Sequence, residues 1–223
     1  PNYNVFDEER YFEPHDEACV FDIDGVRFGV TLCEDVWLPG PALRAREAGA
    51  DILLAMNASP YHIGKEEVRY DVVRLRILEC GIPVVFANLV GGQDELVFDG
   101  GSFAMDNLGH VTHQFAPFEA TLEIIDIENQ RLLPGKIIAP LSKQAAVYKA
   151  LCLGVHDYIT KNGFPGVLLG LSGGVDSALT LAVAVDALGA DKVHAVMMPS
   201  PYTAQISIDD SRVIVLEFAS ADR

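Results

Sequence analysis

The chain has 223 residues, a length that suits one domain or two, and half of its residues are hydrophobic. It holds 16 Lys and Arg against 32 Asp and Glu, a formal charge of −16, which disfavours nucleic acids and membranes as partners because both bind through cationic side chains. No apolar run is long enough to span a membrane, and residues 1–10 are polar and acidic, unlike a signal peptide. Four widely spaced cysteines without a CxxC pair favour free thiols in a reducing cytoplasm over a disulfide framework.

The first part of the chain, up to about Pro134, alternates short apolar runs with turns, a mixture typical of layered α/β structure. Asp24-Gly25 joins two β-rich runs and predicts a tight hairpin. Gly49 and Gly81 stand where two helical patterns stop, which is the usual place of a helix-ending glycine. The expected strands are 18–23, 26–33, 51–57 and 83–89, and the expected helices are 41–48 and 66–80.

The stretch Leu132–Lys143 carries two prolines and a glycine and interrupts the periodic pattern. We therefore expect a first domain at 1–134, a linker at 135–145 and a second domain at 146–223. After the linker the pattern predicts a helix at 145–161, a strand at 167–170, a helix at 176–188 and a strand at 193–198. A strand–helix–strand order predicts a parallel pair with a right-handed crossover. These few elements bury little apolar surface for a domain, so we expect the sequence to be part of a larger enzyme.

A glycine-rich loop separates the strand and the helix of this second part. Glycines allow a ligand to approach the backbone closely, and the first amides of a helix attract anions, so the loop suits a phosphate group. The lysine of a Walker loop is absent. A tight strand–helix turn in which Asp176 only caps the helix is the alternative. The loop consists of Gly170, Leu171, Ser172, Gly173, Gly174, Val175, Asp176 and Ser177.

These eight residues resemble the SGGxDS loop of the ATP-pyrophosphatase superfamily. The flanking sequence, Lys161–Gly189 and AVMMPSPYT at 195–203, resembles that of NAD synthetases of the glutamine-dependent type. The resemblance implies the start of a Rossmann-like parallel-sheet domain of the adenine nucleotide alpha hydrolase kind. It also implies that the loop binds the phosphates of ATP, that Asp176 helps bind Mg²⁺, and that Met198 and Pro199 lie beside the nucleotide.

Cys33 ends an apolar strand, where a lone cysteine is commonly a small buried hydrophobe. Its context, GVRFGVTLCEDVW followed by MNASPYHIGK and FANLVGGQDELVFDGGS, resembles the nitrilase-type glutaminase domain of the same enzymes. The resemblance implies part of an α-β-β-α sandwich with Cys33 as the nucleophile. A thiolate there would attack the side-chain amide of glutamine, release ammonia and leave a thioester for water to hydrolyse.

The same resemblance implies a glutamine pocket, and it places an additional acidic residue, Glu8, near the catalytic cysteine. Each residue also has an ordinary interpretation: Trp37 in the core, Tyr3 and Lys65 on the surface, Ser59 in a turn and Glu8 as a solvated carboxylate. The family's catalytic glutamate and lysine precede a Pro-Asn-Tyr motif, which here is residues 1–3, so we expect them upstream of this sequence. The implied glutamine-binding residues are Tyr3, Glu34, Trp37, Ser59 and Lys65.

Taken together, the resemblances imply an enzyme that hydrolyses glutamine and uses ATP to adenylate and amidate deamido-NAD, giving NAD, AMP and pyrophosphate. Its expected substrates are L-glutamine, deamido-NAD and ATP, with Mg²⁺, and we expect a cytoplasmic homo-oligomer. One alternative is another ATP-pyrophosphatase amidotransferase, such as a GMP or asparagine synthetase, which the nitrilase-like half disfavours. Another is a non-catalytic scaffold that lacks the glutamate and lysine of the triad.

Overall fold

The computed structural model describes residues 10–220 and divides the chain into two compact units. The first unit contains residues 1–90 and 98–140, and the second contains residues 91–97 and 141–223. The boundary between the two units at residues 140 and 141 lies within the predicted linker. That residues 91–97 belong to the second unit is a feature that the sequence did not suggest. Tyr3 and Glu8 lie outside the described residues.

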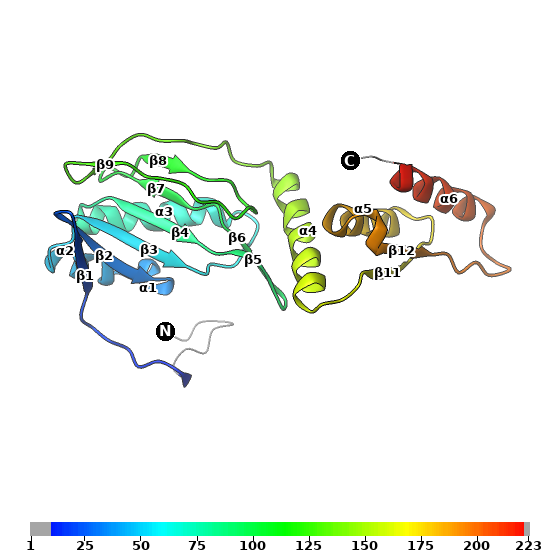
Figure 1. Cartoon of the computed structure of the whole chain (residues 1–223), viewed down its shortest axis with the longest axis horizontal. Coiled ribbons are helices and arrows are strands. Elements are labelled where there is room, and N and C mark those ends of the chain that lie inside the picture. The colour runs from blue at the N-terminus through cyan, green and yellow to red at the C-terminus, as the bar shows by residue number, and fades with distance from the viewer. Residues whose placement is uncertain (1–9, 221–223) are drawn as a thin grey trace. The chain divides into compact units, whose positions relative to one another are not determined.

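The first unit is built on a six-stranded sheet of order β1-β2-β3-β4-β7-β8, with three short to medium helices, α1 to α3 (Figure 1). Strands β2, β3 and β4 are parallel, and β1, β7 and β8 join the two edges in antiparallel fashion. The elements are β1 (Cys19–Ile23), β2 (Val26–Leu32), α1 (Glu34–Trp37), α2 (Pro41–Glu47), β3 (Ile52–Asn57), α3 (Lys65–Cys80), β4 (Val84–Asn88), β7 (Phe103–Met105), β8 (Val111–Gln114), β9 (Ile127–Glu128) and β10 (Arg131–Leu132).

One face of this sheet packs on the helices and forms the main core. Strand residues such as Leu53 and Phe86 meet Ala45 of α2 and Val73 of α3 there, all almost fully buried. Gly29 of β2 faces α2 so closely that a Cβ would lie 2.8 Å from the Cβ of Ala45, so a larger residue would push the helix away. The arrangement of parallel strands with helices on one face agrees with one half of the α-β-β-α sandwich that the resemblance implies.

The predicted breaks in the first unit are confirmed. Asp24 and Gly25 form the turn between β1 and β2, both with positive φ. Helix α3 begins at Lys65, one residue before the expected start, and ends at Gly81, which is left-handed and donates its amide to the carbonyl of Ile77. Each of these boundaries depends on residues within one turn, which is why a local pattern could predict it.

The second unit contains the predicted parallel pair, β11 and β12, with Val167 opposite Val193 and Gly170 opposite Val196. Helix α4 begins at Ser142, whose hydroxyl accepts a hydrogen bond from the amide of Ala145, an N-cap of the usual kind. The elements are α4 (Lys143–Lys161), β11 (Val167–Gly170), α5 (Val175–Leu188), the short 3-10 helix η2 (Ala190–Lys192), β12 (Val193–Val196) and α6 (Gln205–Ser220).

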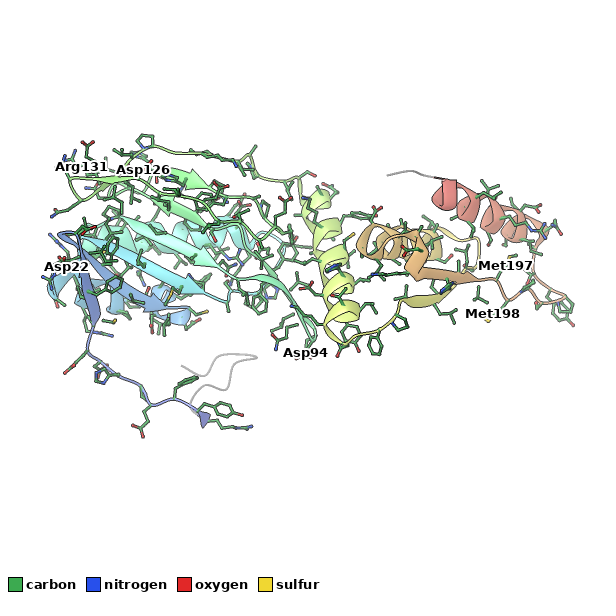
Figure 2. The ribbon with its side chains drawn as sticks, in the orientation of Figure 1. Asp22, Asp94, Asp126, Arg131, Met197 and Met198 are labelled. Atoms are coloured by element: carbon green, nitrogen blue, oxygen red, sulfur yellow. The ribbon has the colours of Figure 1, made fainter. Side chains whose placement is uncertain are left out.

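A hairpin of β5 (Val90–Gln93) and β6 (Leu96–Asp99) also contributes to this unit, with Asp94 in its turn (Figure 2). Asp157 of α4 accepts a hydrogen bond from the amide of Gly92 at 2.7 Å, and Lys161 donates to the carbonyl of Gly92 at 2.7 Å. Asp157 and Lys161 also pair with each other at 2.9 Å. Because both polar groups of one glycine are bound by one helix, residues 91–97 belong with α4 rather than with the sheet from which they extend.

The four cysteines all lie in the described part of the chain and form no disulfide, as expected. Among the described residues, no helix is both long and apolar enough to cross a membrane.

Candidate functional site

Cys33 occupies the sharp turn from β2 into α1, with φ 43° and ψ −101°. Few non-glycine residues adopt such a backbone, and the strain costs about 1–3 kcal/mol. The turn is held because the amide of Cys33 donates to the carbonyl of Met56 at 2.8 Å, continuing the pairing of β2 with β3. The half-buried thiol is thus presented at the carboxyl end of a parallel strand, where ligands of α/β proteins commonly bind.

The residues after Cys33 form the short helix α1, and Lys65 at the start of α3 lies beside them. The ammonium of Lys65 lies over the indole ring of Trp37, 4.0 Å from its centroid. Burial is the main cause that lowers the pKa of Lys65, and the positive charge of Arg69 adds to it. The nearby Glu34 and Cys33 oppose this shift. The structure therefore brings together four of the predicted residues: Cys33, Glu34, Trp37 and Lys65.

Ser59, the fifth predicted residue within the described part of the first unit, is buried in the connection between β3 and α3. Arg69 of α3 donates from Nε to the hydroxyl of Ser59 at 3.2 Å and from Nη2 to its carbonyl at 2.8 Å. Asn88 at the end of β4 accepts the amide hydrogen of Ser59 at 2.9 Å. The amide, the carbonyl and the hydroxyl oxygen of Ser59 are therefore each held by Arg69 or Asn88.

Asn57 is a residue near Cys33 that the sequence analysis did not single out. It follows Met56, the partner of Leu32 in the β2–β3 register, so it stands next to Cys33 at the same edge of the sheet. Its Nδ2 donates to the carbonyls of Ala55 and Ala87, which fixes the orientation of the amide. Its Oδ1 is buried and has no hydrogen-bond partner among the described residues. A buried acceptor without a donor is a candidate for ligand contact.

The glycine-rich loop of the second unit follows β11 directly and leads into α5, whose N-cap is Gly174. The alternative in which Asp176 caps the helix is therefore wrong: Asp176 lies in the first turn, with its side chain exposed. The hydroxyl of Ser177 donates to the carbonyl of Gly174 at 2.9 Å and lies 3.1 Å from the hydroxyl of Ser172. The Ser177 hydroxyl also accepts from the amide of Ser172 at 3.3 Å, and the Ser172 hydroxyl accepts from the amide of Gly174 at 3.4 Å, so the two serines link the loop to the start of α5.

Gly173 allows the loop to approach α6. Its φ is 80°, and a Cβ there would lie 2.4 Å from the backbone oxygen of Ser207, a contact that no side chain could make without displacing α6. A cavity of about 300 Å³ adjoins the loop. It is lined by Gly173, Gly174, Val175, Ala178, Asp210, Val213 and Ile214.

A second, largely apolar cavity of about 380 Å³ lies at the ends of β11 and β12. Met197 lines it, whereas the predicted Met198 is 77% exposed, with its methyl group near Gly170 (Figure 2). Pro199 is also exposed. Alternation along an extended chain separates the two methionines, and the sequence did not show which of them faces inward. The lining residues are Leu171, Ala195, Met197, Ser211, Arg212, Val215 and Leu216.

A cysteine on a strained strand–helix turn, joined in one chain to a glycine-rich loop that follows a parallel strand, agrees with the family comparisons. Residues 1–133 match the family model for carbon–nitrogen hydrolases, and residues 147–221 match that for NAD synthase. The chain belongs to the carbon–nitrogen hydrolase family, and its second part is an NAD synthase domain.

The chain is similar to several proteins named as glutamine-dependent NAD(+) synthetases. It is 44% identical over 213 residues to the one from Acinetobacter baylyi and 47% identical over 215 residues to one from Xylella fastidiosa. These alignments cover 95% and 94% of this chain but 39% of each relative, so the chain spans about two fifths of their length.

A solved structure gives the same result. The glutamine-dependent NAD⁺ synthetase from Acinetobacter baumannii, in complex with ADP, has a TM-score of 0.93 and 40% identity, covering 98% of this chain and 42% of its own.

Proposed function

We propose that the protein carrying this chain is a glutamine-dependent NAD(+) synthetase, in which the first unit hydrolyses glutamine and the second uses ATP to amidate deamido-NAD. The observation that carries the proposal is the strained backbone of Cys33 beside Glu34, Trp37 and Lys65, in a chain that also holds the glycine-rich loop. A strained nucleophile in a turn is costly to stability, and function is the usual reason for keeping it.

In the first unit, the thiolate of Cys33 attacks the Cδ carbon of glutamine, and the carbonyl oxygen becomes an oxyanion. The C–N bond then breaks, the nitrogen takes up the proton that the thiol lost on forming the thiolate and leaves as ammonia, and a thioester remains on Cys33. Water hydrolyses the thioester to glutamate and regenerates the thiol. Lys65, held over Trp37, and Ser59, held by Arg69, bind the glutamine during these steps.

In the second unit, the loop from Gly170 to Ser177 binds the phosphates of ATP through the backbone amides that begin α5. The apolar cavity lined by Met197 suits the adenine ring. Asp176 is exposed at this point, and a single carboxylate fits a Mg²⁺ ion that takes its other ligands from phosphate and water. The ion supplies charge neutralisation at the phosphates, and the chain's contribution is to orient them.

The reaction in this unit transfers the adenylyl group of ATP to the carboxylate of deamido-NAD, releasing pyrophosphate. Ammonia then attacks the activated carboxyl carbon, AMP leaves, and the amide of NAD is formed. Adenylation is needed because a carboxylate is a poor electrophile and its oxygen is a poor leaving group.

The test uses the full-length protein supplied with ATP, Mg²⁺, deamido-NAD and either glutamine or ammonia. We expect NAD, AMP and glutamate with glutamine as the nitrogen donor. Cys33→Ala should abolish the glutamine-driven reaction and leave the ammonia-driven reaction intact, whereas Asp176→Asn should impair both. Equal loss of both reactions in Cys33→Ala, or glutamine-driven turnover without Cys33, would contradict the proposal.

A further inference from the structure

Arg69, which holds Ser59, also forms a buried ion pair with Asp99, and the glutaminase chemistry described above gives Asp99 no role. Nη1 and Nη2 of Arg69 each donate to one carboxylate oxygen of Asp99, both at 2.8 Å. The side chains are only 2% and 9% exposed. Removing two charges from water costs several kcal/mol per ion, so such a pair is weak evidence of a contribution to stability. The other hydrogen bonds made by the pair therefore indicate its role.

The other hydrogen bonds of Arg69, from Nε and Nη2, go to the segment that begins with Ser59. Nε reaches the hydroxyl of Ser59 at 3.2 Å, and Nη2 reaches the carbonyls of Ser59 at 2.8 Å and of Pro60 at 3.4 Å. Asp99 thus holds one edge of the guanidinium, and the other edge holds Ser59. The rigid, planar fork of arginine makes this possible, since it places several N–H groups at fixed angles.

The direction of the Nε contact determines what the hydroxyl of Ser59 can do. A guanidinium has donors only, so the oxygen of Ser59 must accept this hydrogen bond. The hydroxyl proton is then left to point away from Arg69, toward another acceptor. The main chain of Ser59 is held as well, because Asn88 accepts its amide hydrogen and donates from Nδ2 to its carbonyl at 3.3 Å. The oxygen of Ser59 is therefore held in place, and its hydroxyl proton is available for donation to a ligand.

We propose that Arg69 is a positioning residue of the glutaminase site: anchored by Asp99, it holds Ser59 so that the serine hydroxyl donates its proton to an oxygen of the bound glutamine. The proposal rests on the proposed function, in which Ser59 binds glutamine. Arg69 itself does not touch the substrate, and its effect passes through Ser59.

The test measures glutamine kinetics of the full-length protein with Arg69→Lys, which keeps the charge but loses the fork. We expect the KM for glutamine to rise about tenfold, the loss of roughly one hydrogen bond to substrate, with kcat changed by less than about threefold. The ammonia-driven reaction should keep its rate. Arg74→Lys is the matched control, because Arg74 lies on the same helix but pairs with the exposed Asp71. If Arg69→Lys does not fold, Asp99→Asn, which weakens the anchor but keeps its shape, takes its place.

A double-mutant cycle with Ser59→Ala separates positioning from a merely structural role. Ser59→Ala alone should raise the KM for glutamine by a similar factor, and adding Arg69→Lys to it should raise the KM by no more than about twofold. An unchanged KM in either single variant, or an equal rise from Arg69→Lys with and without Ser59, would overturn the proposal. Failure of the proposed function shows itself differently, as glutamine-driven turnover that survives Cys33→Ala.

Discussion

The ammonium of Lys65 lies 4.0 Å from the centroid of the Trp37 indole ring, and the two residues come from different helices. Cation–π contact keeps the long lysine side chain in one place, close enough to Glu34 for the carboxylate charge to act on it. An ammonium held in this way beside Cys33 is suited to bind an anionic or carbonyl group of a substrate, and this gives the first expectation.

Lys65 should make glutamine binding dependent on pH. Because burial and the charge of Arg69 lower its pKa, the ammonium loses its proton at a lower pH than a free lysine does. The KM for glutamine should therefore rise as the pH increases through that pKa. In Lys65→Arg, which stays charged, this rise should disappear, and in Lys65→Met the KM should be raised about tenfold or more at pH 7. Glutamine kinetics between neutral and alkaline pH measure both effects, and the same alkaline rise in Lys65→Arg would contradict the expectation.

The backbone conformation at position 33 should be less strained with glycine than with alanine. At φ 43° and ψ −101° a Cβ is strained, so removing it recovers part of about 1–3 kcal/mol, against roughly 1 kcal/mol lost to the greater freedom of glycine in the unfolded chain. We expect Cys33→Gly to be more stable than Cys33→Ala by about 1 kcal/mol, although both lose the glutamine-driven reaction. Urea unfolding of the two variants compares them directly. An alanine variant that is the more stable one would show that the turn is unstrained.

Gly173→Ala should disrupt the second unit far more than Gly163→Ala. Both glycines have positive φ, 80° and 69°, so alanine costs about 1 kcal/mol at either position. A methyl group added at Gly173 would lie 2.4 Å from the backbone oxygen of Ser207. A methyl group added at Gly163 would have no atom within 4 Å. We expect a loss of about 3 kcal/mol for Gly173→Ala and a raised KM for ATP with either nitrogen source. Equal melting temperatures and equal ATP kinetics in the two variants would contradict this.

Asp157→Asn should weaken the hold of α4 on the β5–β6 hairpin, in a way that depends on pH. Burial raises the pKa of Asp157, but hydrogen bonds from His156, the amide of Gly92 and Lys161 outweigh it, so the pKa is lowered. A carboxyl group whose pKa is lower in the folded than in the unfolded state stabilises the fold at neutral pH. This contribution is lost as the pH falls through the folded-state pKa. We expect the variant to lose about 1 kcal/mol at pH 7, and we expect this difference to disappear once the pH is below the lowered folded-state pKa of Asp157.

Thermal unfolding of the wild type and the variant at neutral and acid pH checks this expectation. Asp71→Asn is the control, because its carboxylate pairs with an exposed arginine on α3 and should contribute little. A difference between wild type and Asp157→Asn that persists unchanged at acid pH would mean that the carboxylate charge is not what binds Gly92.

The local features of this protein could be predicted because each depends on residues close together in the chain. The hairpin at Asp24-Gly25, the helix end at Gly81 and the loop that precedes α5 follow from backbone preferences of glycine and from hydrophobic periodicity, and the structure confirms all three. The place of Met198 beside the nucleotide stays a prediction. Packing puts Met197 in the apolar cavity and leaves Met198 exposed, and no local pattern specifies which of two adjacent methionines is covered.

Local patterns were enough to predict strands β1 to β4, helices α2 to α5, strands β11 and β12, the place of Cys33 at a strand end and the glycine-rich loop. Contacts between distant segments, which no local pattern specifies, join Asp99 to Ser59 through Arg69, place Lys65 over Trp37 and attach residues 91–97 to α4. A turn or a helix end is set by the energies of a few adjacent dihedral angles, whereas a buried charge is tolerated only where distant segments close around it and satisfy its hydrogen bonds.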